Sequence, residues 1–179
     1  MNLPSARTYG GWLAIVRVLT GCIWLLHALP KFLKADMFLP PNGTFATYLQ
    51  NGIGKTVGPY HDFLVNVVQP NALTFADMVR FGELLVGITL VLGLFTRFGA
   101  LVGVALTADY IAARGGLSTA NSWGSLDACL MLLSAISLVL PTGSVAGIDG
   151  LRRPRAPRQQ RVVAEVVPER PLDGPRAPQ

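Results

Sequence analysis

Four apolar segments, each close to the length of a membrane span, most constrain how this 179-residue chain can fold. They cover residues 11–29, 76–95, 98–113 and 123–140. A helix needs roughly 20 mostly apolar residues to cross about 30 Å of hydrocarbon, because each residue advances it by about 1.5 Å. The pattern predicts an all-α integral membrane protein. Residues 1–151 are expected to form a four-transmembrane-helix bundle in contact with the lipid bilayer.

The third segment is the shortest, so a re-entrant segment is an alternative to a full span there. Gly99, Gly103 and Thr107 recur at every fourth residue of this segment. Small residues at that spacing let membrane helices approach closely. The stripe therefore favours a full span that packs inside the bundle.

The connection between the first two segments, residues 30–75, is too long to be a simple loop. Within it, residues 60–68 place four apolar side chains on one helical face, and Pro70 is expected to end that helix. The four are Phe63, Leu64, Val67 and Val68. We expect an interfacial helix that rests on the outer membrane surface, covers the mouth of the bundle, or does both.

Residues 152–179 form a segment rich in proline and arginine without apolar periodicity, which predicts a disordered basic tail. Positive charge within about 20 residues of a span marks the cytoplasmic side. An even number of spans then places both the N- and the C-terminus in the cytoplasm. A basic segment of this kind can bind acidic lipid or an acidic surface of a partner protein, and no nucleic-acid partner is expected.

Ionisable side chains inside the spans are the most unusual feature of the sequence. The first span carries Arg17, Trp24, His27 and Lys31 at spacings of seven, three and four, which places them near one helical face. An ionised residue at the bilayer centre costs about 2.5–3.5 kcal/mol, so such groups normally face the bundle interior and pair. The other spans contribute Asp77, Arg80, Glu83, Asp109, Tyr110, Trp123 and Asp127.

Antiparallel threading places most of these groups toward the outer ends of the helices, whereas Arg17 and Glu83 lie deeper. Counting from the helix midpoints separates Arg17 and Glu83 by roughly 8 Å in depth, a gap that two long side chains can close, so we expect them to pair. Three interpretations remain open for the whole set. It forms structural ion pairs, a polar pocket for a small polar or amphiphilic molecule, or, less favoured, a proton or ion path.

The sequence contains no set of residues spaced as the ligands of a metal ion. Cys22 and Cys129 lie in different spans and do not form a Cys-x-x-Cys motif, and the only histidines are His27 and His61. We therefore expect no metal site, no haem and no covalently bound cofactor.

Three stretches resemble a known family. Arg17, Gly21, His27 and Lys31 resemble its first-helix pattern. Residues 82–100, GELLVGITLVLGLFTRFGA, are similar to its Glu-Leu-Leu-x-Gly and Gly-Leu-x-x-Arg signature, and residues 141–150, PTGSVAGIDG, are similar to its closing turn. The chain resembles the DoxX/DoxD family of four-helix bacterial membrane proteins from about residue 17 to 150, and residues 60–71 resemble the DoxD-like branch.

The resemblance implies a bacterial plasma-membrane location and a link to quinone-coupled oxidation of sulfur compounds, as in the small subunit of thiosulfate:quinone oxidoreductase. It implies a membrane quinone as the redox molecule and a protein partner or second copy within the membrane. The candidate catalytic residues are then Glu83, Arg80, His27 and Arg17. Aromatic and polar groups are expected to form the quinone pocket, namely Trp24, Lys31, Asp109, Tyr110, Trp123 and Asp127.

A non-catalytic accessory or assembly subunit of a larger membrane redox complex is the alternative, because the chain is small and lacks cofactor ligands. Solute transport is less favoured, since the sequence shows neither an internal repeat nor a pair of discontinuous helices.

Overall fold

The computed structural model describes residues 6–116, 125–144 and 147–151, and every secondary-structure element in these ranges is helical. The expected all-α class is therefore confirmed. In chain order the elements are α1 (Ala6–Leu33), α2 (Ala35–Phe38), α3 (Thr44–Lys55), α4 (Pro59–Phe63), the π-helical turn η1 (Leu64–Val68), the 3₁₀ turn η2 (Gln69–Asn71), α5 (Ala72–Leu92), α6 (Thr96–Ala113), α7 (Leu126–Val139), the 3₁₀ turn η4 (Thr142–Ser144) and α8 (Ile148–Leu151).

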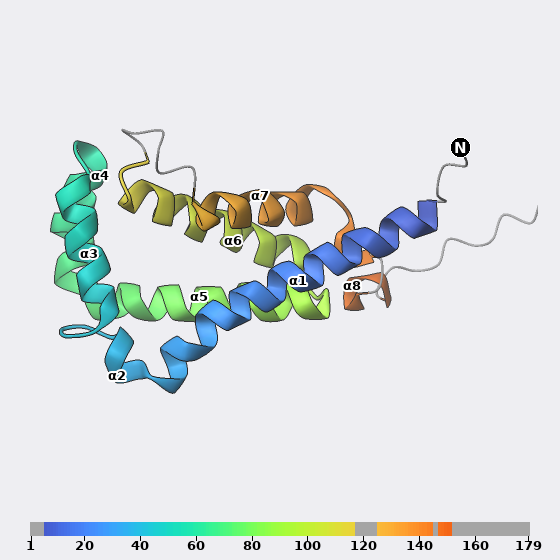
Figure 1. Cartoon of the computed structure of the whole chain (residues 1–179), viewed down its shortest axis with the longest axis horizontal. Helices are drawn as coiled ribbons and strands as arrows, with labels where there is room; N and C mark the ends of the chain where they lie inside the picture. The colour runs from blue at the N-terminus through green and yellow to red at the C-terminus, as the bar shows by residue number, and fades with distance from the viewer. Residues whose placement is uncertain (1–5, 117–124, 145–146, 152–179) are drawn as a thin grey trace, which may run out of the picture.

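Four long helices form the body of the molecule (Figure 1). α1 packs along α5, α5 packs on α6, and α6 packs on α7. The short helices α2, α3 and α4 gather at one end of this body, whereas the start of α1 and the short helix α8 lie at the opposite end. The chain therefore runs back and forth between two ends, and we call the end that carries α3 and α4 the capped end.

The long helices correspond to the four apolar segments with shifted limits. α1 extends past its expected end, and Pro30 lies inside it instead of beginning a loop. The Pro30 carbonyl still accepts a hydrogen bond from the Lys34 N–H at 2.9 Å. Proline lacks an N–H donor but keeps its carbonyl, so the last turn of α1 closes normally.

The long connection folds into more helix than its sequence pattern predicts. The expected helix over residues 60–68 is present as α4 and η1, and Leu64 and Val68 are buried against Leu49 of α3. The helix α3 was not predicted, since it contains two threonines and two glycines, which weaken a helical pattern. Pro70 does not end the helical path, because it sits in the first turn of η2, where its missing N–H costs no hydrogen bond.

Length and apolar character identify one helix able to cross a membrane within the described ranges, residues Gly10–Leu33 of α1. α5 carries Asp77, Arg80 and Glu83, and α7 is 14 residues long. The expected set of four spans is thus not established by this criterion. The outward faces of the long helices nevertheless expose large apolar side chains, such as Leu26, Leu132 and Val139, at 70%, 62% and 72%.

The stripe of small residues on α6 packs as its sequence predicted. Gly99, Gly103 and Thr107 are all buried. A Cβ atom at Gly103 would lie 2.9 Å from the Ser134 hydroxyl of α7, and Gly99 is in similarly close contact with Thr89 of α5. α6 is therefore held between α5 and α7 by contacts that leave no room for larger side chains.

Glycines also fix the contact between α1 and α5. A Cβ atom at Gly21 would lie 2.8 Å from the backbone nitrogen of Val91, and a Cβ atom at Gly87 would lie 2.6 Å from Cδ2 of Leu25. The two helices are therefore antiparallel, with residue 21 beside residue 91 and residue 25 beside residue 87. Continuing this register places Lys31 near the level of Glu83 and Arg17 near the level of Gly93.

The Gly21→Ala variant tests this register. The added methyl group meets the α5 backbone, which cannot move away as a flexible side chain does, so the free energy of unfolding is expected to fall by about 1–3 kcal/mol. Gly11→Ala in the same helix is the matched control, because nothing lies within 4 Å of its added Cβ. Chemical unfolding in mixed micelles, followed by circular dichroism, compares the two; equal effects would contradict the close α1–α5 contact.

Candidate functional site

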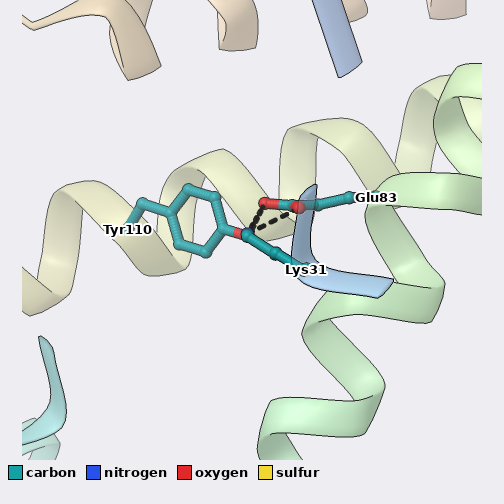
Figure 2. Close-up of polar contacts among 3 residues, drawn as sticks. All are labelled: Lys31, Glu83 and Tyr110. Carbon is teal, nitrogen blue, oxygen red and sulfur yellow. Dashed lines mark hydrogen bonds and ion pairs between the residues drawn. The ribbon is translucent and has the colours of Figure 1, made fainter. Parts of the chain in front are cut away.

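Three helices bring together a cation, a carboxylate and a phenol near the capped end (Figure 2). Lys31 Nζ of α1 lies 2.6 Å from both carboxylate oxygens of Glu83 on α5. The Tyr110 hydroxyl of α6 donates a hydrogen bond of 2.7 Å to Glu83 Oε1. We call these three residues the Glu83 cluster; the carboxylate is its shared acceptor.

Solvent exposure differs within the Glu83 cluster: Glu83 is buried, and Lys31 is partly exposed. The Glu83 side chain is 3% exposed and that of Lys31 is 19% exposed. A buried carboxylate is stabilised only when a cation and hydrogen-bond donors replace its lost water, and Lys31 and Tyr110 provide both. The ammonium group also lies 5.0 Å from the centre of the Phe38 ring of α2.

Arg80 lies one turn before Glu83 on α5 but has different partners. Its Nη2 pairs with Asp77 Oδ1 at 2.7 Å, and its guanidinium carbon lies 5.1 Å and 5.3 Å from the ring centres of Phe32 and Phe81. Cations over aromatic faces gain about 0.5–2 kcal/mol. The i, i+3 pairing expected from the sequence is present, but no hydrogen bond joins Arg80 to Glu83 among the contacts of the described residues.

Trp24 is buried in the core of the bundle, beside Val86 and Leu90 of α5 and Ala100 of α6. Tyr110 packs against the same group of residues. Within the described ranges, the indole Nε1–H of Trp24 has no hydrogen-bond partner. A buried donor of this kind is costly unless something accepts from it. Trp24 is thus an aromatic wall of the bundle interior with an unused donor.

Asp109 and Asp127 make separate contacts at the same end. Tyr60 of α4 donates a hydrogen bond of 2.7 Å to Asp109 Oδ1, which ties the capping helices to α6. Burial raises the pKa of the Tyr60 phenol, and the hydrogen bond to Asp109 raises it further, so the phenol stays protonated as a donor at neutral pH. Asp127 Oδ2 of α7 pairs with Arg114 Nη2 at 3.1 Å. Trp123 lies outside the described residues.

The expected Arg17–Glu83 pair is wrong. Arg17 is 1% exposed, as expected for a deep residue, but its Nη1 donates to the carbonyl oxygen of Thr142 at 2.8 Å. The α1–α5 register explains the error, because fourteen residues separate Arg17 from Lys31, or about 21 Å along α1. Counting from helix midpoints failed because the register, and not the midpoint, decides which residues face each other.

His27 was expected on the interior face of α1 and is instead exposed. The buried face of the helix follows Ala14, Arg17, Gly21, Trp24 and Ala28. These positions differ by three or four residues, and His27 precedes Ala28 by one, a rotation of about 100°. His27 therefore lies outside the Glu83 cluster.

The comparisons with known proteins identify the family. Residues 12–166 match the family described as "TQO small subunit DoxD", a range that includes α5, α6, α7 and all but the first six residues of α1. The chain belongs to the DoxD family. No curated protein and no solved structure matches it. Membership confirms the resemblance seen in the sequence, and together with the apolar helix α1 it makes this DoxD protein membrane-associated.

The sequence pattern missed several polar groups that the DoxD structure brings into contact. Asp149 Oδ1 accepts from the Phe95 N–H at 2.9 Å, and Oδ2 accepts from the Thr96 N–H and the Thr96 hydroxyl at 3.0 and 2.8 Å. The closing turn of the family resemblance contains Asp149, which was the available signal. No sequence pattern pointed to the polar contacts of Tyr60 and Arg114. Each lies beside an apolar run, and no acidic residue follows it at helical spacing.

Metal ligands do not cluster in the described part of this DoxD protein: no group of three or more His, Cys, Asp or Glu side chains there is placed to hold an ion. The polar interior groups instead act as hydrogen-bond donors and acceptors. The Glu83 cluster offers what a small molecule with carbonyl oxygens requires, namely N–H and O–H donors next to aromatic walls.

Proposed function

We propose that this DoxD-family protein is the membrane-embedded subunit of a quinone-linked oxidoreductase, of the thiosulfate:quinone type, and that the Glu83 cluster binds the quinone head group. The observation that carries the proposal is the Glu83 carboxylate, buried in the bundle and shared by Lys31 Nζ and the Tyr110 hydroxyl. Such a cluster supplies protons within an apolar interior.

The residues present fit a quinone. A quinone carries two carbonyl oxygens on a flat apolar ring, and its reduction takes up two electrons and two protons. Lys31 has three N–H donors and directs two of them at the Glu83 oxygens, so one donor remains for a carbonyl oxygen. Trp24 contributes a buried N–H without a partner and an aromatic wall.

Each residue of the cluster then has a distinct task. Lys31 Nζ donates to a head-group oxygen and is the proton donor at the more exposed side of the cluster. Tyr110 holds one Glu83 oxygen in place and so orients the carboxylate. Glu83 is the counter-ion of the Lys31 ammonium and holds it in place. Arg80 and Asp77 position α5 against the Phe32 ring of α1.

We also propose that the four long helices cross the bacterial plasma membrane, with both termini in the cytoplasm. Large exposed apolar side chains on their outer faces suit lipid better than water. The start of α1 and helix α8 share one end of the molecule, as an even number of crossings requires (Figure 1). The arginines that follow α8 in the sequence mark that end as cytoplasmic.

Quinone binding to the purified full chain in lipid nanodiscs tests the proposal. A short-chain benzoquinone is titrated while tryptophan fluorescence is followed. Lys31→Met is expected to weaken binding at least tenfold, because it removes the donor to the carbonyl oxygen. Lys34→Met is the matched control, since Lys34 is exposed and three residues away, and it should stay within about twofold. Absence of saturable binding to the wild type, or equal effects of the two variants, contradicts a quinone site at Lys31.

A non-catalytic accessory subunit is the second candidate, and one observation favours it. Both Glu83 oxygens are already engaged within the chain, which is the arrangement expected of a polar contact that only joins α1, α5 and α6. Under this alternative the wild type does not bind quinone, and the only effect of Lys31→Met is to lower the stability of the protein. Native mass measurement of the protein extracted in mild detergent would then show a co-purifying membrane protein.

A further inference from the structure

A hollow of about 390 Å³ opens beside the start of α6, where Phe95, Thr96, Arg97 and Phe98 line it. Its volume falls in the range of about 300–1,000 Å³ typical of small-molecule clefts. Residues from α6, from the end of α7 and from the turn before α8 line it. This hollow is separate from the Glu83 cluster, because fourteen residues of α6 separate Thr96 from Tyr110, about 21 Å along the helix.

The rim of the hollow is apolar and aromatic. The rings of Phe95 and Phe98 are 58% and 57% exposed, and Leu140 is also exposed. Phe95 adopts a left-handed backbone conformation, with φ of 49°, which a bulky residue rarely does. Such strain persists only where the surroundings hold it, and here Asp149 binds the Phe95 N–H. The fold thus maintains an exposed aromatic ring beside the hollow.

The inner wall holds a polar group with no partner. Ser137 of α7 lines the hollow and is 1% exposed, and among the described residues its hydroxyl makes no hydrogen bond. A buried hydroxyl without a partner costs free energy that an acceptor in the hollow would recover. This donor points to a ligand that carries an acceptor oxygen.

The charge balance of the hollow favours an anion. The Asp149 carboxylate accepts three hydrogen bonds at the start of α6, and it interacts electrostatically with the buried Arg17 guanidinium. Arg97 lines the hollow and is exposed, and its charge has no such counter-ion among the contacts of the described residues.

We infer that this hollow binds the head group of an anionic phospholipid, with Arg97 on the phosphate, the Ser137 hydroxyl on a head-group oxygen, and the Phe95 and Phe98 rings against the first part of the acyl chains. A free phosphate ester would not use the two exposed rings, and the cationic group of a zwitterionic lipid would be repelled by the exposed Arg97 charge. The inference requires a membrane location but is independent of the quinone proposal.

Lipid retention by the purified full chain tests the site. The protein is taken up in a neutral detergent, phosphatidylglycerol or phosphatidylcholine is added, and native mass spectrometry counts the bound lipid. The wild type is expected to retain phosphatidylglycerol in preference to phosphatidylcholine. Arg97→Gln should lower retention of phosphatidylglycerol about fivefold, and Ser137→Ala about threefold, because each removes one contact to the head group.

Two control variants separate the hollow from general attraction to positive charge. Lys55→Gln removes one charge from α3 at the capped end, and Arg158→Gln removes one from the basic tail. Both should change retention less than twofold. An Arg158→Gln effect as large as that of Arg97→Gln, unchanged retention in Ser137→Ala, or equal retention of the two lipids would overturn the assignment.

A competition arm distinguishes the lipid from a soluble phosphate ester. Glycerol 3-phosphate, added in large excess, is expected to leave phosphatidylglycerol bound, because it lacks the acyl chains that contact Phe95 and Phe98. Displacement by glycerol 3-phosphate would instead make the hollow a site for soluble phosphate esters and would overturn the lipid assignment. Quinone titration of Arg97→Gln should match the wild type, so failure of one proposal leaves the other testable.

Discussion

Replacing Glu83 with alanine is expected to lower the free energy of unfolding by about 2–4 kcal/mol, because it leaves the Lys31 ammonium without its counter-ion inside the bundle. The Tyr110 hydroxyl loses its acceptor in the same variant. Adding Lys31→Met removes the stranded charge, so the double variant should lose less than the sum of the single losses, by about 1–3 kcal/mol. Chemical unfolding in mixed micelles measures all three variants.

Arg17 provides the matched comparison for this experiment. It is as deeply buried as Glu83 but contacts Thr142 of η4, and it lies about 21 Å from Lys31 along α1. Combining Glu83→Ala with Arg17→Met should therefore give additive losses within about 0.5 kcal/mol. Additive losses for the Lys31 pair together with a coupling for the Arg17 pair would show that the antiparallel register of α1 and α5 is wrong.

Asp149→Ala is expected to have an effect of similar size at the other end, lowering the free energy of unfolding by about 2–4 kcal/mol. Phe95 occupies the N-cap position of α6 and makes no side-chain hydrogen bond to it. The Asp149 carboxylate takes that role instead, accepting from the Phe95 and Thr96 N–H groups and from the Thr96 hydroxyl. Its removal exposes the first turn of α6, and faster hydrogen exchange at residues 95–99 should report it.

Two further variants define the cause of that loss. Asp149→Asn keeps the size and one acceptor oxygen but removes the charge, so about half of the effect should remain. Asp62→Ala removes an exposed carboxylate from α4 and should change stability by no more than about 0.5 kcal/mol. Equal effects of Asp149→Ala and Asp62→Ala would contradict a capping role for Asp149.

Local patterns were enough to predict the four long helices. The apolar runs located α1, α5, α6 and α7 to within a few residues, because burial or lipid contact selects apolar side chains continuously along a helix. The stripe of Gly99, Gly103 and Thr107 was confirmed as a close-packing surface for the same reason, since a helical face depends only on spacing. The disordered state expected for residues 152–179 stays a prediction outside the described residues.

The candidate site was predicted in part. Glu83, Lys31 and Tyr110 were all selected from the sequence, because ionisable and phenolic groups inside apolar helices stand out. Asp77 and Arg80 pair as their i, i+3 spacing predicted. His27 was wrongly placed on the interior face of α1. The prediction relied on its four-residue spacing from Lys31 and not on the face defined by Trp24 and Ala28, which is the buried one.

Sequence alone therefore determined which residues lie on the four long helices and which of them must find polar partners. Tertiary structure alone decided which partner each one has. Lys31 reaches Glu83 because Gly21 and Gly87 set one antiparallel register between α1 and α5, whereas Arg17 lies about 21 Å away along α1 and reaches Thr142 of η4. A shift of that register by a few residues would separate Lys31 from Glu83 while leaving the helical pattern of the sequence unchanged. The polar pairs of this bundle thus depend on close backbone contacts between helices, which no single helix specifies.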